Sequence, residues 1–102
     1  MTVKLVVLYT QPDDPAAFDA HYVNVHVPLV RKIPGLERFE TGTFTAALDG
    51  GESTYHRIAE LYFRDQVAMD DAFGSPAGAA TAEDYGKIAP LGSRMFIQAV
   101  DE

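Results

Sequence analysis

The chain has 102 residues, of which 47% are hydrophobic and 23% are charged, so its size and composition fit one globular domain over residues 1–102. Its formal net charge of −7 disfavours nucleic-acid binding, because an acidic surface repels phosphate, and its lack of cysteine excludes disulfides, thiolate metal sites and cysteine nucleophiles. No apolar run approaches the roughly 20 residues of a membrane span and the N-terminus lacks the features of a signal peptide, so we expect a cytoplasmic protein without a membrane partner.

The first predicted elements are a strand over residues 3–9 and a helix over residues 14–33. The strand carries apolar side chains on both faces, which indicates that both faces are covered. Asp14 is expected to cap the helix, and apolar residues recur behind it at helical spacing. Pro28 lies inside this helix and leaves one carbonyl group without its usual donor, so a kink or a loosened turn is predicted there.

The rest of the chain predicts three more strands and two more helices. The strands are expected over residues 36–48, 55–63 and 94–100, and the helices begin at caps formed by Asp65 and Ser75. The resulting order, β-α-β-β-α-α-β, is the ferredoxin-like arrangement of the α+β class, with a four-stranded antiparallel sheet and helices on one face.

The predicted sheet has one more apolar face than its helices can cover. Val6 and Leu8 lie beside the inward residues of the first strand, and Ile58 and Tyr62 do so on the third. One layer of helices covers only one face, so the other face needs a partner. We therefore expect a homodimer in which two sheets pack face to face.

The helix over residues 14–33 carries the side chains that are best suited to chemistry. At 100° per residue from Phe18, Tyr22 lies at about 40° and His26 at about 80°, within the apolar stripe, whereas His21 lies at about −60° on its other edge. An inward histidine needs a hydrogen-bond partner, and one that faces a cavity can transfer protons near neutral pH. The alternative is that His26 and Tyr22 are ordinary core residues with satisfied polar atoms.

The third strand adds four residues that share one face by the two-residue period: His56, Ile58, Glu60 and Tyr62. Polar groups on a covered face indicate a cavity lining, although His56 and Glu60 on a solvent-open rim would give the same pattern. A metal site of His26, His56 and Glu60 is an alternative that no ligand spacing supports, and no phosphate-binding glycine loop or nucleophilic serine elbow is present. We therefore expect neither a metal nor a cofactor.

Two stretches of this sequence resemble the EthD family of dimeric α/β-barrel proteins. They are residues 21–29 (HYVNVHVPL) and residues 55–63 (YHRIAELYF), followed in the family's order by residues 75–78 (SPAG). The similarity spans nearly the whole chain. It implies a ferredoxin-like fold that dimerises into an α/β barrel.

For the site, the resemblance implies that His26 is the catalytic residue and that Tyr22 and Tyr62 line its pocket. Asp84 matches an acidic position of the family, whereas Ala77 stands where glutamate is expected. Together with the residues of the third strand, the candidate substrate-binding set is Tyr22, Tyr62, His56, Glu60 and Asp84.

The resemblance predicts the fold more closely than the reaction, because related barrels include muconolactone isomerases, cofactor-free monooxygenases and haem-degrading enzymes. We expect a cofactor-independent oxidoreductase, isomerase or lyase that acts on a small hydrophobic or aromatic oxygenated compound, with His26 as acid or base. Two alternatives stay open. One is a non-catalytic module that binds such a compound or assists an oxygenase, and the other is a haem-handling barrel with His26 as the axial ligand.

Overall fold

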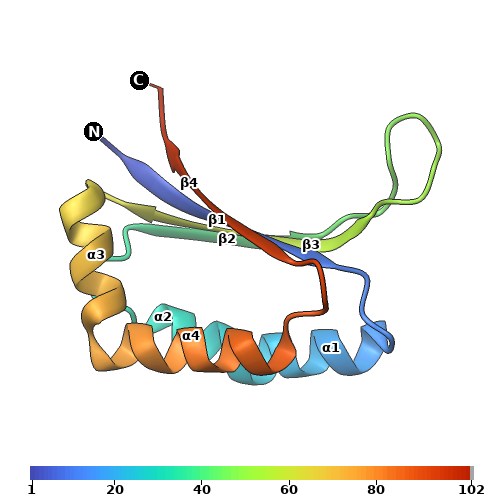
Figure 1. Ribbon diagram of the computed structural model, residues 1–102, viewed down its shortest axis with the longest axis horizontal. Coiled ribbons are helices and arrows are strands. Elements are labelled where there is room, and N and C mark those ends of the chain that lie inside the picture. The colour runs from blue at the N-terminus through green and yellow to red at the C-terminus, as the bar shows by residue number, and fades with distance from the viewer. Residues whose placement is uncertain (102) are drawn as a thin grey trace.

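The computed structural model describes residues 1–101 and consists of a four-stranded antiparallel sheet with helices packed on one face (Figure 1). The sheet order is β2-β3-β1-β4. The elements, in chain order, are β1 (Val3–Thr10), α1 (Pro15–His21), the π-helix η1 (Tyr22–His26), α2 (Val27–Arg31), β2 (Arg38–Thr43), β3 (Tyr55–Phe63), α3 (Gln66–Gly74), α4 (Pro76–Ile88) and β4 (Arg94–Ala99). The predicted α+β class and ferredoxin-like order are confirmed. Within residues 1–101, the helices are too short or too polar to cross a membrane.

The inner face of the sheet, which faces the helices, holds the core. Alternate residues of β1 and β3 point inward, and the pairing register places Val7 opposite Ala59 and Val3 opposite Phe63. All four are buried, together with Phe18 of α1. Each large side chain that is fully buried contributes roughly 1.5–3 kcal/mol relative to exposure, so this face holds the helices on the sheet.

The outer face of the sheet carries no helix (Figure 1). It is formed by Lys4, Val6 and Leu8 of β1, Ile58, Glu60 and Tyr62 of β3, and Phe96 of β4. Phe96 pairs with Val6 across the two strands and remains 45% exposed. The described chain therefore has the uncovered, partly apolar face that the sequence predicts.

Strand β2 is shorter than predicted. The sequence predicted a strand over residues 36–48, but β2 ends at Thr43. Its partner β3 starts at Tyr55, which leaves residues 45–54 beyond the end of the ladder. These residues form a loop that turns at Gly50, whose φ of 87° lies in the left-handed region that favours glycine.

The long first helix is present but changes form in its middle. Asp14 caps it as predicted, because its Oδ1 accepts a hydrogen bond from the amide of Ala17 at 3.1 Å. In the π-helix η1 the amide of Val27 bonds to the carbonyl of Tyr22, five residues back. Pro28 follows at once; it has no N–H and its ring crowds the carbonyl four residues back, so the wider turn relieves a conflict. The predicted loosened turn is confirmed.

Helices α3 and α4 meet at a close contact. Ser75 caps α4, since its Oγ accepts a hydrogen bond from the amide of Gly78 at 3.1 Å. A Cβ atom at Gly78 would meet the carbonyl oxygen of Ala72 and lie 2.6 Å from the Cα of Phe73, so only glycine fits there. This junction sets the position of α3 relative to α4.

Replacing Gly78 with alanine should lower the free energy of unfolding by about 1–3 kcal/mol, because overpacking forces α3 and α4 apart. Gly86→Ala is the matched control in the same helix, since nothing lies within 4 Å of its added Cβ. That change should stabilise the protein by about 0.5–1 kcal/mol through helix propensity. Urea unfolding measures both, and equal stabilities would contradict the close contact.

Candidate functional site

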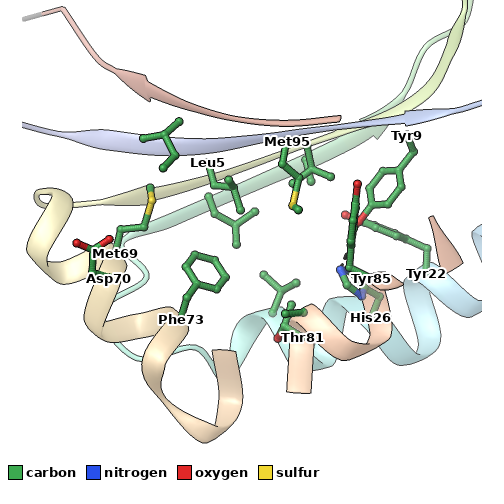
Figure 2. Close-up of a pocket in the computed structure, with 16 residues that line it drawn as sticks. Leu5, Tyr9, Tyr22, His26, Met69, Asp70, Phe73, Thr81, Tyr85 and Met95 are labelled. Carbon is green, nitrogen blue, oxygen red and sulfur yellow. Dashed lines mark hydrogen bonds between the residues drawn. The ribbon is translucent and has the colours of Figure 1, made fainter. Parts of the chain in front are cut away.

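A cavity of about 300 Å³ lies between the inner face of the sheet and the helices. Its walls come from β1, β3 and β4 on one side and from η1, α2, α3 and α4 on the other (Figure 2). Most of the lining is apolar and includes Leu5 and Phe73, while Asp70 at one end is exposed. The polar atoms gather at the opposite end, on Tyr9, Tyr22, His26 and Tyr85. The cavity thus has an apolar body and one polar, buried end.

His26 is buried at this polar end and has a partner on each side of its ring. Its Nδ1 lies 2.8 Å from Oδ2 of Asp84, and its Nε2 lies 3.4 Å from the hydroxyl oxygen of Tyr9. A carboxylate can only accept a hydrogen bond, so Nδ1 carries the proton and Nε2 keeps a lone pair toward Tyr9 and the cavity. Asp84 therefore selects the tautomer that leaves a base facing the cavity.

Burial and hydrogen bonding set the charge states of this pair. Burial lowers the pKa of His26 below its ordinary value, against the hydrogen bond and the charge of Asp84, which act to raise it. Burial also acts to raise the pKa of Asp84, but the hydrogen bonds to His21 and His26 outweigh it and hold that pKa below its ordinary value. At neutral pH the site thus holds a neutral imidazole beside a carboxylate anion.

Three tyrosine rings surround His26. The ring centroid of Tyr9 lies 5.6 Å from those of both Tyr22 and Tyr85, and the Tyr22 ring lies 5.2 Å from the imidazole. Burial raises the pKa of all three hydroxyl groups, so each keeps its proton at neutral pH. The Tyr22 hydroxyl group is 3.0 Å from Oγ1 of Thr41, whereas the Tyr85 hydroxyl group hydrogen-bonds to no other residue within 1–101. Tyr85 therefore offers a donor to a ligand.

Arg57 of β3 supports this tyrosine cluster. It is buried, and its guanidinium carbon lies 4.3 Å from the centroid of the Tyr22 ring. It also donates hydrogen bonds to Thr41 and Asp19, each at 3.2 Å. A desolvated cation over an aromatic ring contributes up to about 2 kcal/mol, so Arg57 holds the Tyr22 ring in place.

The structure brings three of the predicted site residues together: Tyr22 and His26 on η1, and Asp84 on α4. Sequence reasoning missed Tyr9 and Tyr85 as parts of the site. Both lie at inward positions, since Tyr9 continues the alternation of β1 and Tyr85 lies on the inner stripe of α4. That periodic signal could have found them.

The prediction that His56 shares a sheet face with Glu60 is wrong. The register between β1 and β3 shifts beside His56, which breaks the strict two-residue alternation. The Nε2 atom of His56 lies 2.9 Å from Oδ1 of Asp19 on α1, and its ring meets that of Phe18 edge-on. His56 therefore packs against the helix layer and does not line the cavity.

Glu60 and Tyr62 lie on the outer face, with the sheet between them and His26. Glu60 Oε2 accepts hydrogen bonds from Lys4 Nζ at 2.8 Å and from the Tyr62 hydroxyl group at 3.1 Å. The bond to Lys4 holds the pKa of Glu60 below its ordinary value, which keeps the ion pair charged. The expectation that Tyr22 and Tyr62 line one cavity therefore does not hold within a single chain.

The metal site considered from the sequence is not assembled. His26 lies in the cavity wall, His56 pairs with Asp19, and Glu60 lies on the outer face. In residues 1–101, no three histidine or carboxylate side chains are grouped so that they could hold a metal ion.

This chain is similar over most of its length to known proteins of one family. A profile of the EthD domain matches residues 11–91. A protein described as an uncharacterized 11.0 kDa protein in the thcB-thcC intergenic region of Rhodococcus erythropolis is 40% identical over 93 residues, which cover 91% of this chain and 89% of that protein. The crystal structure of an ethyl tert-butyl ether d (EthD) family protein from Bacillus halodurans is 36% identical, with a TM-score of 0.93 over 99% of this chain and 100% of that chain.

More distant solved structures share the fold alone. Hydroxynitrile lyase from Passiflora edulis is 13% identical, with a TM-score of 0.80 over 99% of this chain and 94% of that chain. SnoaB, a cofactor-independent oxygenase from Streptomyces nogalater, is 15% identical, with a TM-score of 0.71 over the same shares. A dimeric ferredoxin-like protein of unknown function from Jannaschia is 14% identical, with a TM-score of 0.73 over 98% of this chain and 100% of that chain.

The charge states in the site predict how stability depends on pH. Because the pKa of His26 is lowered by folding, the unfolded chain binds more protons than the folded chain below the ordinary value of 6.5, and the free energy of unfolding falls there. One such group contributes a slope of at most about 1.4 kcal/mol per pH unit. The lowered pKa of Asp84 acts in a separate window, because its stabilisation is lost only as the pH falls below the ordinary value of 3.8.

In His26→Gln, the slope that His26 contributes below pH 6.5 should disappear, whereas His56→Gln, which lies outside the cavity, should retain it. Urea unfolding between about pH 5 and pH 7.5 measures the slopes. The same slope in the wild type and in His26→Gln would show that His26 is not buried as a neutral imidazole.

Proposed function

The chain belongs to the EthD family, and we propose that it binds a small apolar, aromatic or cyclic oxygenated compound in its cavity and acts on it by proton transfer at His26, without a cofactor. One observation carries this proposal: Nε2 of His26 lies in the wall of an apolar cavity without a proton, 3.4 Å from the Tyr9 hydroxyl oxygen, while Asp84 holds Nδ1 at 2.8 Å. A positioned base of this kind contributes roughly 10²–10⁴-fold to a reaction rate.

The lining of the cavity favours a ligand with a mainly apolar body. The side chains of Leu5, Met69 and Phe73 give their part of the cavity a mainly apolar surface, so a polar ligand group beside them would lose water with few hydrogen-bond partners in exchange. At the other end, the Tyr85 hydroxyl group can donate to a ligand, and the Tyr9 hydroxyl group, which is bonded to Nε2 of His26, can do so once Nε2 takes up a proton. An oxygen atom of the ligand at this end can accept hydrogen bonds while a neighbouring C–H or O–H group approaches His26.

In the proposed reaction, Nε2 of His26 accepts a proton from the carbon or oxygen next to the polar group of the substrate. Negative charge then develops on the substrate oxygen, where the hydroxyl groups of Tyr9 and Tyr85 can stabilise it. Asp84 stabilises the imidazolium cation that forms on His26. Such an anion is a common first intermediate of isomerase, lyase and cofactor-independent oxygenase reactions, and lyase and oxygenase activities are the ones named for two proteins of the same fold.

A non-catalytic binding module, acting alone or beside an oxygenase, is the second candidate. In its favour, Nε2 of His26 already has a partner in Tyr9, and the Tyr22 hydroxyl group has one in Thr41. The site is therefore satisfied without a substrate. Such a module would release the compound unchanged.

Native mass spectrometry of the purified protein identifies a retained compound, which is then assayed for turnover. His26→Gln should lower turnover by about 10²–10⁴-fold with less effect on binding, because glutamine has no basic lone pair to accept the proton. The control His56→Gln should keep full turnover, since His56 lies outside the cavity. Unchanged turnover in His26→Gln would remove the catalytic role, and binding without any product would favour the binding module.

We propose further that two chains pair through their outer faces to form a dimeric α/β barrel in the cytoplasm. Val6, Leu8, Ile58 and Phe96 form the apolar part of this face, which no helix covers. Burial of apolar surface of this kind is the main force in association. The Jannaschia protein of the same fold is described as dimeric, which supports a dimer here.

Ile58→Glu should convert the dimer to a monomer, because it places an unpaired charge at the centre of the shared face. Light scattering on a sizing column measures the mass, which should fall to half. Val67→Glu is the control, because Val67 is a 67% exposed apolar residue on α3, away from the outer face. A mass that Ile58→Glu leaves unchanged would contradict pairing through this face.

A further inference from the structure

The geometry points to His21 as a third member of the site: we propose that it positions Asp84 for His26 and that, when protonated, it withdraws the charge of that carboxylate from His26 and weakens it as a base. This inference rests on the proposed function of His26. It assigns to His21 the role of a positioning residue, which acts through Asp84 without contact to the substrate.

The three residues share a single carboxylate. Nε2 of His21 lies 2.9 Å from Oδ1 and 3.2 Å from Oδ2 of Asp84, and Oδ2 is also the partner of His26. The two imidazoles differ in their access to water, since the His26 side chain is 5% exposed and that of His21 is 39% exposed. The carboxylate therefore links a histidine of the cavity with a histidine in contact with solvent.

The π-helix explains how both histidines reach Asp84. In a regular α-helix, side chains five residues apart differ by about 140° in direction, so His21 and His26 would face different sides. In η1 the hydrogen bonds span five residues, which widens the turn between the two histidines. Both rings can then converge on one residue of α4, and the close contact of Asp84 with each of them is the result.

Few other charges compete for His21. Its own helix also carries Asp19, which is held by His56 and Arg57. On α4, the neighbouring charges Glu83 and Lys87 pair with each other at 3.3 Å. Among residues 1–101, Asp84 is the carboxylate that pairs with His21 and His26 alike, so a change of charge on His21 acts directly on the partner of His26.

The effect on His26 has a definite sign. A neutral His21 leaves Asp84 with its full negative charge, which favours the cation that forms when His26 takes a proton. A protonated His21 places a positive charge against the same carboxylate, and one carboxylate cannot fully compensate two imidazolium cations. Burial is the main cause that lowers the pKa of His26, and the charge of His21 lowers it further. Protonation of His21, which contacts solvent, therefore makes His26 a weaker base.

The test uses protein labelled with ¹⁵N in its histidine rings, which needs no substrate. In the wild type, the ring-nitrogen shifts of His26 should change with pH in two steps, because its own protonation and a change of charge on the other side of Asp84 both alter them. His21→Gln keeps an amide donor to Asp84 but cannot take up a proton. In this variant the second step should vanish, the pKa of His26 should rise, and the proton should stay on Nδ1. The control His56→Gln should keep both steps.

His21→Ala separates positioning from charge, because it removes the donor as well. Its His26 ring should lose part of its preference for the tautomer with the proton on Nδ1, and His21→Gln should restore that preference. A His26 titration that His21→Gln leaves unchanged would overturn the proposal. Failure of the proposed function shows elsewhere, as full turnover in His26→Gln, so the two outcomes cannot be confused.

Discussion

A single backbone constraint, the lack of an N–H group at Pro28, determines the form of the site. The α-helix that Asp14 caps cannot keep its regular bonding up to Pro28, and it widens into η1, which ends two residues before this proline. The widened turn contains Tyr22 and ends at His26, the two residues that place an aromatic ring and an imidazole side by side in the cavity wall. A π-helical turn often marks a functional site. Here the turn directs the side chains of Tyr22 and His26 into the cavity wall.

The site also depends on compensation of the negative charge of a buried carboxylate by hydrogen-bond donors. An isolated buried charge costs several kcal/mol, so Asp84, which is only 7% exposed, depends on the donors that reach it. Both are imidazoles at the ends of the widened turn: His21 immediately precedes η1 and lies at 2.9 Å, and His26 is its last residue and lies at 2.8 Å. The arrangement therefore holds α4 against η1 and at the same time fixes the tautomer of the histidine that faces the cavity. Stability and proposed chemistry depend on the same two hydrogen bonds.

Much of this organisation is local and could be predicted from the sequence. The caps at Asp14 and Ser75, the inward stripe that contains His26 and the disturbance at Pro28 all follow from neighbouring residues. The partner of His26 could not be derived in this way, because Asp84 is 58 residues away in the chain and only the packing of α4 brings it near. Family resemblance marked Asp84 as an acidic position but assigned it to the substrate.

The incorrect face of His56 has a different origin, since strand periodicity holds only while the register is constant. The shift at the end of β1 reverses the expected direction of His56, whereas Glu60 and Tyr62, beyond the shift, keep to the outer face. The sheet thus divides the polar residues into two sets. The Lys4–Glu60–Tyr62 set lies on the face that the proposed dimer would cover, while His26, its carboxylate partner and the tyrosines around it lie under the opposite face, within one chain. If pairing and chemistry occupy opposite faces of one sheet, the partner need not contribute to proton transfer, and its effect on the site must pass through the sheet that holds Tyr9.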